Sequence, residues 1–295
     1  MYIQDAINTL VDKKKALSTR NLKNVSHLSS EEVRAIAIAL SYDSAIIELR
    51  RRAKKKFVFH VATPKSGSTW VARSVGSYMR NQGWKTPSMT VGGGNRAQDL
   101  FLSELVRLEA LNSNIFSDHQ HCVFSNYVME QLIAIDAKIL FQTRNLYDIL
   151  VSLRDHLDNE TTVKPMFFIS EGQWTTLTQS EKLDFLIYNV APWFINFWVG
   201  WSEAQKAMGN NFLVVRYEDI LEDPDTAFEA ILNFSELPKH DFPTSIDSIY
   251  TKRVFTRKNK AVIGRGELFS EEHRNHVKTL CKPYKNVDFS VIGIP

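Results

Sequence analysis

One short stretch constrains what this chain can fold into more than any other: FVFHVATPKSGSTWVARSVGSYM, from Phe57 to Met79. Its beginning, Phe57 to Ala62, is mostly apolar, with aromatic and β-branched residues, which predicts a buried strand. From Trp70 onward the apolar residues recur with helical spacing. The polar residues between the two are therefore expected to form a strand-to-helix turn.

The polar turn has the composition of an anion-binding loop. A helix start leaves backbone N–H groups without partners and carries the positive end of the helix dipole. Gly67 lets the backbone approach an anion closely, and Lys65 adds a mobile cation. Ser68 and Thr69 add hydroxyl donors. The turn is predicted to bind a phosphate-like anion; the simpler alternative is a capped polar turn without a ligand.

The order of residues in this loop differs from that of kinases and NTPases. Their pattern is G-x-x-x-x-G-K-[ST], in which the lysine follows the second glycine. Here Lys65 precedes Gly67, and no segment of the chain matches the pattern. An ordinary ATP or GTP enzyme is therefore disfavoured.

The segment TPKSGSTWVARSV, residues 63–75, resembles the 5′-phosphosulfate loop of sulfotransferases that use 3′-phosphoadenosine 5′-phosphosulfate (PAPS). Three further segments match this family in the same order, so the resemblance covers most of the chain from Phe57 onward. It implies PAPS as the sulfuryl donor and a set of loop residues that bind it. These residues are Lys65, Ser66, Gly67, Ser68 and Thr69. Trp70 resembles the family's adenine-stacking tryptophan, with a core aromatic as the alternative.

The second matching segment is KILFQTRNLYDILVSLRDH, residues 138–156. Its first half is a continuous apolar run of the kind found in parallel sheets, and helical spacing follows from Asn145. It resembles the family's 3′-phosphate element, which implies that Arg144 and Ser152 bind the 3′-phosphate of PAPS. An arginine fork suits a phosphate dianion. Taken alone, Arg144 would more often be a surface ion-pair partner of Asp148.

The third matching segment, residues 190–234, resembles the family's tryptophan-bearing helix, a strand that ends in Tyr-Glu-Asp, and a further helix. Tyr217, Glu218 and Asp219 are expected to organise the turn after the strand rather than to take part in the chemistry.

The fourth segment, residues 255–280, resembles the C-terminal loop that contacts the 3′-phosphate in the family. Asn259 stands where the family's loop usually has arginine, and an alanine stands where it has glycine. Lys260 is the best match, and Arg257 or Arg265 is a candidate for the missing cation. The alternative is a solvated basic loop.

Transfer of a sulfuryl group to a hydroxyl or amine needs a base, and neutral histidine suits this role at pH 7. The family's base lies at a strand end between the two phosphate elements. In this chain that window contains His119 and His121, and alternation along a strand places both on one face. Resemblance favours His119; His60 and His156 are further candidates. The implied mechanism is in-line displacement, with Lys65 compensating charge on the leaving phosphate oxygen.

We expect an α/β fold of the P-loop-NTPase-like type, with three layers and a mainly parallel central sheet flanked by helices. Strands are predicted at Phe57–Thr63, Ile115–His119, Ile139–Thr143 and Phe212–Tyr217. Such sheets bind ligands at the carboxyl ends of their strands. Residues 1–56 are expected to form a helical N-terminal extension, and residues 57–295 the sulfotransferase domain.

Composition narrows the setting of this enzyme. The 295 residues include two cysteines, Cys122 and Cys281, which argues against a disulfide framework and against a clustered zinc site, so no metal is expected. The N-terminal residues do not have the pattern of a signal peptide, and no segment predicts a membrane anchor, so a cytoplasmic location is expected. The formal net charge of +3 is too small to predict a nucleic-acid partner, even with the basic run Arg50–Lys56.

We interpret the chain as a soluble, bacterial-type sulfotransferase of secondary metabolism that modifies a hydroxyl or amine of a small-molecule acceptor. The sequence predicts neither the identity of the acceptor nor the oligomeric state. A P-loop-type small-molecule or nucleotide kinase is one rival, although it lacks a Walker lysine here. A non-catalytic PAPS- or nucleotide-binding module is the other, and the presence of His119 and His121 argues against it.

Overall fold

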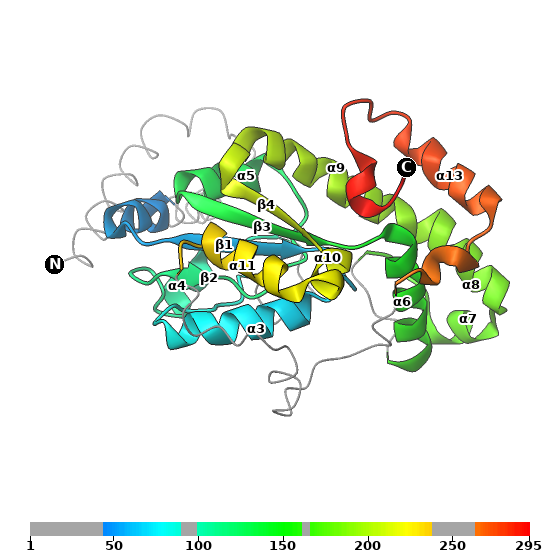
Figure 1. The fold of residues 1–295 in the computed structure, drawn as a ribbon, viewed down its shortest axis with the longest axis horizontal. Coiled ribbons are helices and arrows are strands. Elements are labelled where there is room, and N and C mark those ends of the chain that lie inside the picture. The colour runs from blue at the N-terminus through cyan, green and yellow to red at the C-terminus, as the bar shows by residue number, and fades with distance from the viewer. Residues whose placement is uncertain (1–43, 90–98, 161–165, 238–262) are drawn as a thin grey trace, which may run out of the picture.

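The computed structural model describes residues 44–89, 99–160, 166–237 and 263–295. Within these ranges, four parallel strands form one sheet in the order β2-β1-β3-β4 (Figure 1). The strands are β1 (Phe57–Ala62), β2 (Ile115–Phe116), β3 (Ala137–Thr143) and β4 (Phe212–Arg216). This parallel sheet with flanking helices confirms the predicted fold class.

The α-helices for which complete bounds are described follow the strands in chain order. They are α3 (Ser68–Asn81), α4 (Ser103–Arg107), α5 (Asn126–Ala134), α6 (Leu146–Asn159), α7 (Glu171–Thr176), α8 (Gln179–Phe185), α9 (Ala191–Met208), α10 (Tyr217–Glu222), α11 (Pro224–Phe234) and α13 (Glu271–Cys281). Between α8 and α9 lies a π-helical turn, Leu186–Val190, directly before Pro192. Short 3-10 turns occupy Gly209–Asn211, Arg265–Leu268 and Phe289–Ile292.

The sheet separates two buried cores, which gives the fold its three layers. Side chains of a strand alternate between its faces. On one face Val58 and Leu140 pack with residues of α3 and α11. On the other face Phe141 lies 5.1 Å, centroid to centroid, from Trp198 of α9. Figure 1 shows α3 and α9 on opposite sides of the sheet.

The strand predicted at Ile115–His119 is shorter in the structure and ends at Phe116. The reason is a side chain that replaces a backbone acceptor: Ser117 Oγ accepts the His60 N–H at 2.9 Å. The chain bulges there and then returns to β1, where Gln120 N–H donates to His60 O at 2.9 Å. His119 therefore lies in the bulge between two points of contact with β1.

The other predicted strands match closely. β1 ends one residue earlier than predicted, although Thr63 N–H still donates to Gln142 O at 2.9 Å. β3 begins two residues earlier, at Ala137, because the turn before it is already paired with β1. β4 ends at Arg216, since Tyr217 is the first residue of α10.

The described part of the N-terminal extension packs against the rest of the chain. Residues 44–53 are helical, and Ile46 belongs to one of the two buried cores. Arg50 is buried and donates to backbone carbonyls that include Leu111 O, at 2.8 Å. Residues 1–43 lie outside the described ranges, so most of the predicted extension stays a prediction.

None of the helices in the four described ranges combines the length and the apolar character that crossing a membrane requires.

Candidate active site

The predicted anion-binding turn lies at the carboxyl end of β1 and leads into α3. Gly67 is the N-cap of α3 and has a φ of 77°, in the left-handed region that favours glycine. The space is closed as well, because a Cβ atom at Gly67 would lie 2.6 Å from the ring of Tyr217. Lys65 also has a positive φ, 67°. The sharp shape of the turn therefore depends on glycine at position 67.

The start of α3 keeps its positive electrostatic character. The first turn of this 14-residue helix contains no acidic residue, so no carboxylate there offsets the helix dipole. The buried Ser66 hydroxyl donates to Thr63 O at 2.7 Å and so stabilises the turn itself. Ser68 is buried and Thr69 is half-buried in the first turn. Backbone N–H groups of this turn and the Lys65 side chain are the groups suited to an anion.

Arg144 follows the carboxyl end of the neighbouring strand β3. Its side chain is buried, Nη2 lies 3.4 Å from Asp148 Oδ2, and the guanidinium carbon stacks 4.5 Å from the centre of the Tyr217 ring. The predicted Asp148 partner is thus confirmed, but the pair is buried rather than on the surface. Ser152 is buried on α6, two helical turns after Arg144.

Tyr217 brings the two predicted phosphate elements together. One ring contacts the Gly67 position and also supports the Arg144 guanidinium. Burial raises the pKa of the Tyr217 hydroxyl, and the Arg144 charge opposes this shift only in part. Its neighbour Glu218 accepts the Asn145 N–H at 2.9 Å, directly after Arg144. The residues after β4 therefore organise this edge of the sheet, as predicted for the turn.

His119 is paired with the carboxylate that precedes it. Asp118 Oδ1 lies 2.9 Å from His119 Nδ1. A carboxylate only accepts hydrogen bonds, so Nδ1 carries the proton and Nε2 of the neutral ring is the basic nitrogen. Burial opposes ionisation of Asp118, but its hydrogen bonds with His119 and the charge of His119 outweigh burial and lower the pKa of the carboxyl group.

His121 lies beside His119, with 5.6 Å between the ring centroids. Its Nδ1 lies 2.7 Å from Ala62 O and therefore donates to a neutral carbonyl. His121 is 5% exposed, whereas the His119 side chain is 13% exposed. Both candidates thus have their Nδ1 proton assigned by a neighbour, but only His119 has a carboxylate behind the ring.

The chain returns to this site from its C-terminal region. The buried Asp148 carboxylate accepts the Gly266 N–H at 2.7 Å and the Gly264 N–H at 3.0 Å. Arg265 donates to Asp155 at 2.6 Å on the same helix, α6. Lys260 lies outside the described residues, so its contact with a 3′-phosphate, like that of Arg265, stays a prediction.

Trp70 is placed in the core on the α3 side of the sheet. Its ring is buried and meets Phe228 of α11 edge-on, with 5.8 Å between centroids. This is the core packing that the sequence left open as an alternative to adenine stacking.

Several residues of this site were not predicted from the sequence as functional. Asp118 was signalled only by its position next to His119. Gln142 is a fully buried amide in an apolar strand, and it donates to Ser66 O at 2.7 Å. His60, predicted only as a further candidate base, lies 3.0 Å from Gln142 Oε1. A polar residue inside an otherwise apolar strand was the signal available for both.

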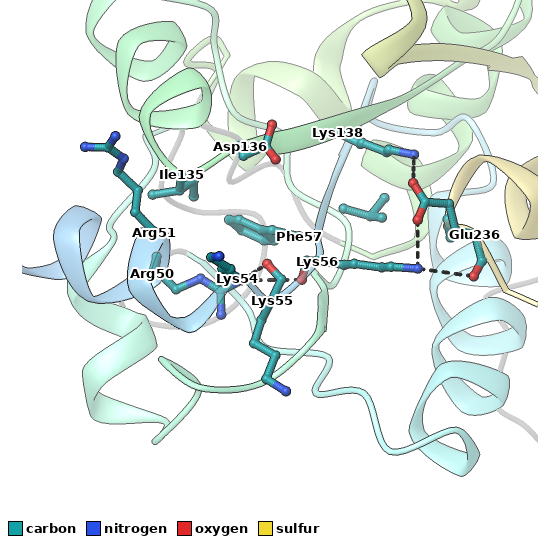
Figure 2. A pocket seen from close by; sticks show the side chains of 12 residues that line it. Arg50, Arg51, Lys54, Lys55, Lys56, Phe57, Ile135, Asp136, Lys138 and Glu236 are labelled. Atoms are coloured by element: carbon teal, nitrogen blue, oxygen red, sulfur yellow. Dashed lines mark hydrogen bonds and ion pairs between the residues drawn. The ribbon is translucent and has the colours of Figure 1, made fainter. Parts of the chain in front are cut away.

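A second basic region lies at the opposite, amino edge of the sheet, around a pocket of about 410 Å³ (Figure 2). Its residues include Arg50, Arg51, Lys54, Lys55, Lys56, Asp136, Lys138 and Glu236. Helices end here, and their terminal carbonyls carry partial negative charge. Lys138 Nζ donates to Phe234 O at 3.0 Å, and Lys56 Nζ lies 2.8 Å from Glu236 Oε2. These cations therefore serve helix ends and an ion pair, which makes this region structural.

The described ranges contain no group of three or more histidine, cysteine, aspartate or glutamate side chains arranged to hold a metal ion.

The fold and this edge of the sheet define an α/β protein with an anion-binding strand-to-helix turn. A family model described as "Sulfotransferase domain" matches residues 55–279 of the chain. The chain therefore belongs to the sulfotransferase domain family and is a sulfotransferase, as the four sequence segments predicted.

Two solved structures similar to this chain are those of a mouse protein and of an insect-independent comparison by title alone, retinol dehydratase. The mouse sulfotransferase SULT7A1, complexed with 3′-phosphoadenosine 5′-phosphate (PAP), is 18% identical; the match covers 79% of this chain and 86% of that chain, with a TM-score of 0.57. Retinol dehydratase, in complex with androsterone and inactive cofactor PAP, is 14% identical over 78% of this chain and 81% of that chain, with a TM-score of 0.44. The mouse structure supports the fold. No curated protein matches this sequence.

Proposed function

We propose that this sulfotransferase takes the sulfuryl group from PAPS and transfers it to a hydroxyl or amine of a small-molecule acceptor. One observation carries the proposal: the anion-binding turn, the Arg144 guanidinium and the Asp118–His119 pair all lie at the carboxyl edge of one parallel sheet. Ligands of such sheets bind at this edge.

The chain's own groups fit a ligand with two separate phosphate groups. The glycine turn and the start of α3 suit the 5′-phosphosulfate, because the turn has no room for a side chain at Gly67 and no acid in the first turn. Arg144 and Ser152 suit the 3′-phosphate, and the fork of Arg144 is held in plane by Tyr217. Both similar structures named above were solved with PAP, the desulfated product of this donor.

Each residue then has one role in the displacement. PAPS supplies the activated sulfuryl group. His119 Nε2 removes the acceptor's proton, while Asp118 keeps the proton on Nδ1 and stabilises the charged ring that results. Lys65 places positive charge where the leaving phosphate oxygen becomes negative. We propose His119 rather than His121 as the base because it is more exposed and has the carboxylate partner.

We extend the proposal to a cytoplasmic, bacterial-type enzyme of secondary metabolism that needs no metal. Cys122 and Cys281 are both free thiols in the structure, which suits a reducing compartment. The proposal for a small-molecule acceptor follows the resemblance to soluble members of the family.

The test is a thermal-shift titration with PAP, ADP and ATP on the wild type, on Arg144→Ala and on Arg154→Ala. A ligand that binds only the native state raises the apparent melting temperature. We expect selective stabilisation by PAP that is lost in Arg144→Ala and kept in Arg154→Ala, whose side chain pairs with Asp155 on the same helix. An equal response to ATP, or no response to PAP, would overturn the donor assignment and favour a kinase. Binding of PAP without turnover on a broad acceptor panel would favour a non-catalytic module.

A further inference from the structure

Two buried polar side chains lie in the strands directly beneath the anion-binding turn. His60 in β1 and Gln142 in β3 are both 0% exposed. His60 pairs with Leu140 in the register of the two strands, and Gln142 is two residues further along, so both side chains lie on the α3 face of the sheet. His60 Nε2 lies 3.0 Å from Gln142 Oε1, and Gln142 Nε2 lies 2.7 Å from Ser66 O.

The direction of these hydrogen bonds is determined by their end point. Ser66 O is a carbonyl and only accepts, so the Gln142 amide nitrogen must face it and the amide oxygen must face His60. His60 Nε2 therefore carries the proton that is donated to Gln142. Burial, with a further contribution from the charge of His119, lowers the pKa of His60 to about 3, so this ring stays neutral near pH 7. The result is a one-way chain of donors from His60 to the turn.

Holding the Ser66 carbonyl also orients the next N–H group. The C=O of Ser66 and the N–H of Gly67 belong to one planar peptide, and the structure has no cis peptide bond among the residues it describes. In a trans peptide these two groups point to opposite sides. A carbonyl held down toward Gln142 therefore directs the Gly67 N–H away from the sheet, toward the side of the turn where α3 begins.

We propose that Gln142, supported by His60, is a positioning residue that pre-orients the Ser66–Gly67 peptide of the anion-binding turn. The inference rests on the proposed function, in which this turn binds the 5′-phosphosulfate end of PAPS. Donors that are already oriented need no rearrangement when an anion binds or when charge develops on it. Ser66 thus contributes through its carbonyl, whereas its hydroxyl is bonded to Thr63 within the turn.

The first test measures the Kd of PAP by calorimetry for the wild type, Gln142→Leu and Gln142→Glu. We expect about tenfold weaker binding in both variants, because each lacks the donor to Ser66 O. Gln142→Glu keeps the shape and the acceptor for His60, so a role in packing alone would leave its affinity unchanged. Gln131→Leu, at another buried glutamine on α5, is the matched control and should bind PAP like the wild type.

The ligand-free melting temperature of every variant shows whether it is folded. If Gln142→Leu does not fold, Gln142→Glu carries the test. Unchanged affinity in a folded Gln142 variant would overturn the inference while leaving the donor assignment intact. Failure of the wild type to bind PAP would instead overturn the proposed function, so the two failures are distinguishable.

The second test is a double-mutant cycle with His60→Leu. We expect a loss of PAP affinity of about threefold in His60→Leu alone and no further loss when it is added to Gln142→Leu, since His60 acts through the amide. Additive losses would show that His60 acts by another route and would overturn its place in the chain. The ratio of the KM for PAPS to the KM for the acceptor should rise in the same variants, whereas a general structural defect would not change that ratio.

Discussion

Two buried arginines at opposite edges of the same sheet show how differently a cation can be used. Arg50, at the amino edge, donates to the backbone carbonyls of Leu111 and Ser113, both at 2.8 Å, and of Lys55 at 3.0 Å. Arg144, at the carboxyl edge, pairs with Asp148 at 3.4 Å and stacks on Tyr217. Their exposed fractions are similar, 2% and 5%.

The difference lies in what each guanidinium contacts. Several carbonyls around Arg50 satisfy its N–H groups and join the end of one helix to the loop before β2, so this arginine stabilises the fold. A ring beneath Arg144 contacts the face of the guanidinium and fixes the directions of its in-plane donors, which suits recognition of a phosphate. The basic run Arg50–Lys56 looks more like a binding site in the sequence, yet it belongs to the structural edge.

The largest effect is expected for the base at the carboxyl edge. His119→Ala should lower kcat by about 10²- to 10⁴-fold, because the acceptor's proton then has no positioned acceptor. The Kd of PAP should stay within about twofold of the wild-type value, since His119 is not assigned to either phosphate. His121→Ala is the matched control in the same kinetic assay, and a greater loss in that variant would reverse the assignment.

The two arginines provide the sharpest break in the comparison. Arg50→Met should lower the free energy of unfolding by about 3 kcal/mol, because it leaves buried carbonyls without donors. The protein that remains folded should bind PAP normally. Arg144→Ala should instead weaken PAP binding by about a hundredfold with a smaller change in stability. Denaturant unfolding and calorimetry together check both expectations, and loss of PAP affinity in folded Arg50→Met would contradict the division of roles.

A third prediction concerns acid sensitivity from beneath the anion-binding turn. The pKa of His60 is lowered to about 3 in the folded chain, below its ordinary value of 6.5. The unfolded chain therefore binds more protons between these values, so the stability contribution is complete above pH 6.5 and is lost as pH falls toward 3. His60→Leu should remove this loss, about 1.4 kcal/mol per pH unit within the window. Denaturant unfolding at pH 7 and pH 5 measures it; equal pH dependence in the variant and the wild type would contradict it.

The smallest effect is expected at the amino edge. Hydrogen bonds from Lys138 and Lys56 lower the pKa of Glu236 to about 2, so its contribution is present above pH 4.5 and is lost as pH falls toward 2. Solvent screens this exposed side chain, and Glu236→Gln should cost only about 0.5 kcal/mol near pH 7. The cost should shrink further in high salt, as denaturant unfolding would show; a change in PAP affinity would mean that this edge is also a ligand site.

The sequence predicted the parts of the site that are written in consecutive residues. The strand, the turn at Gly67 and the helix after it depend on local composition, and so do the strand and helix around Arg144. The same holds for the parallel sheet, because buried strands alternate with helical segments along the chain.

The unpredicted parts depend on pairings between distant segments. The Gln142–His60 contact requires the register of β1 and β3, which neither strand reveals alone. The short strand at Ile115 depends on Ser117 replacing a backbone acceptor of His60. The Asp148 carboxylate receives N–H groups from residues more than 100 positions away, and a sequence pattern does not show such a pair.

The contact between Gly67 and Tyr217 makes these two positions a single unit of variation. A larger residue at position 67 requires a smaller one at position 217, because the ring fills the space that a side chain would need. The smaller residue would then remove the surface on which Arg144 rests. A change in the turn that faces one phosphate is thereby transmitted to the group that faces the other, so the two halves of the donor site cannot drift apart independently in related sequences.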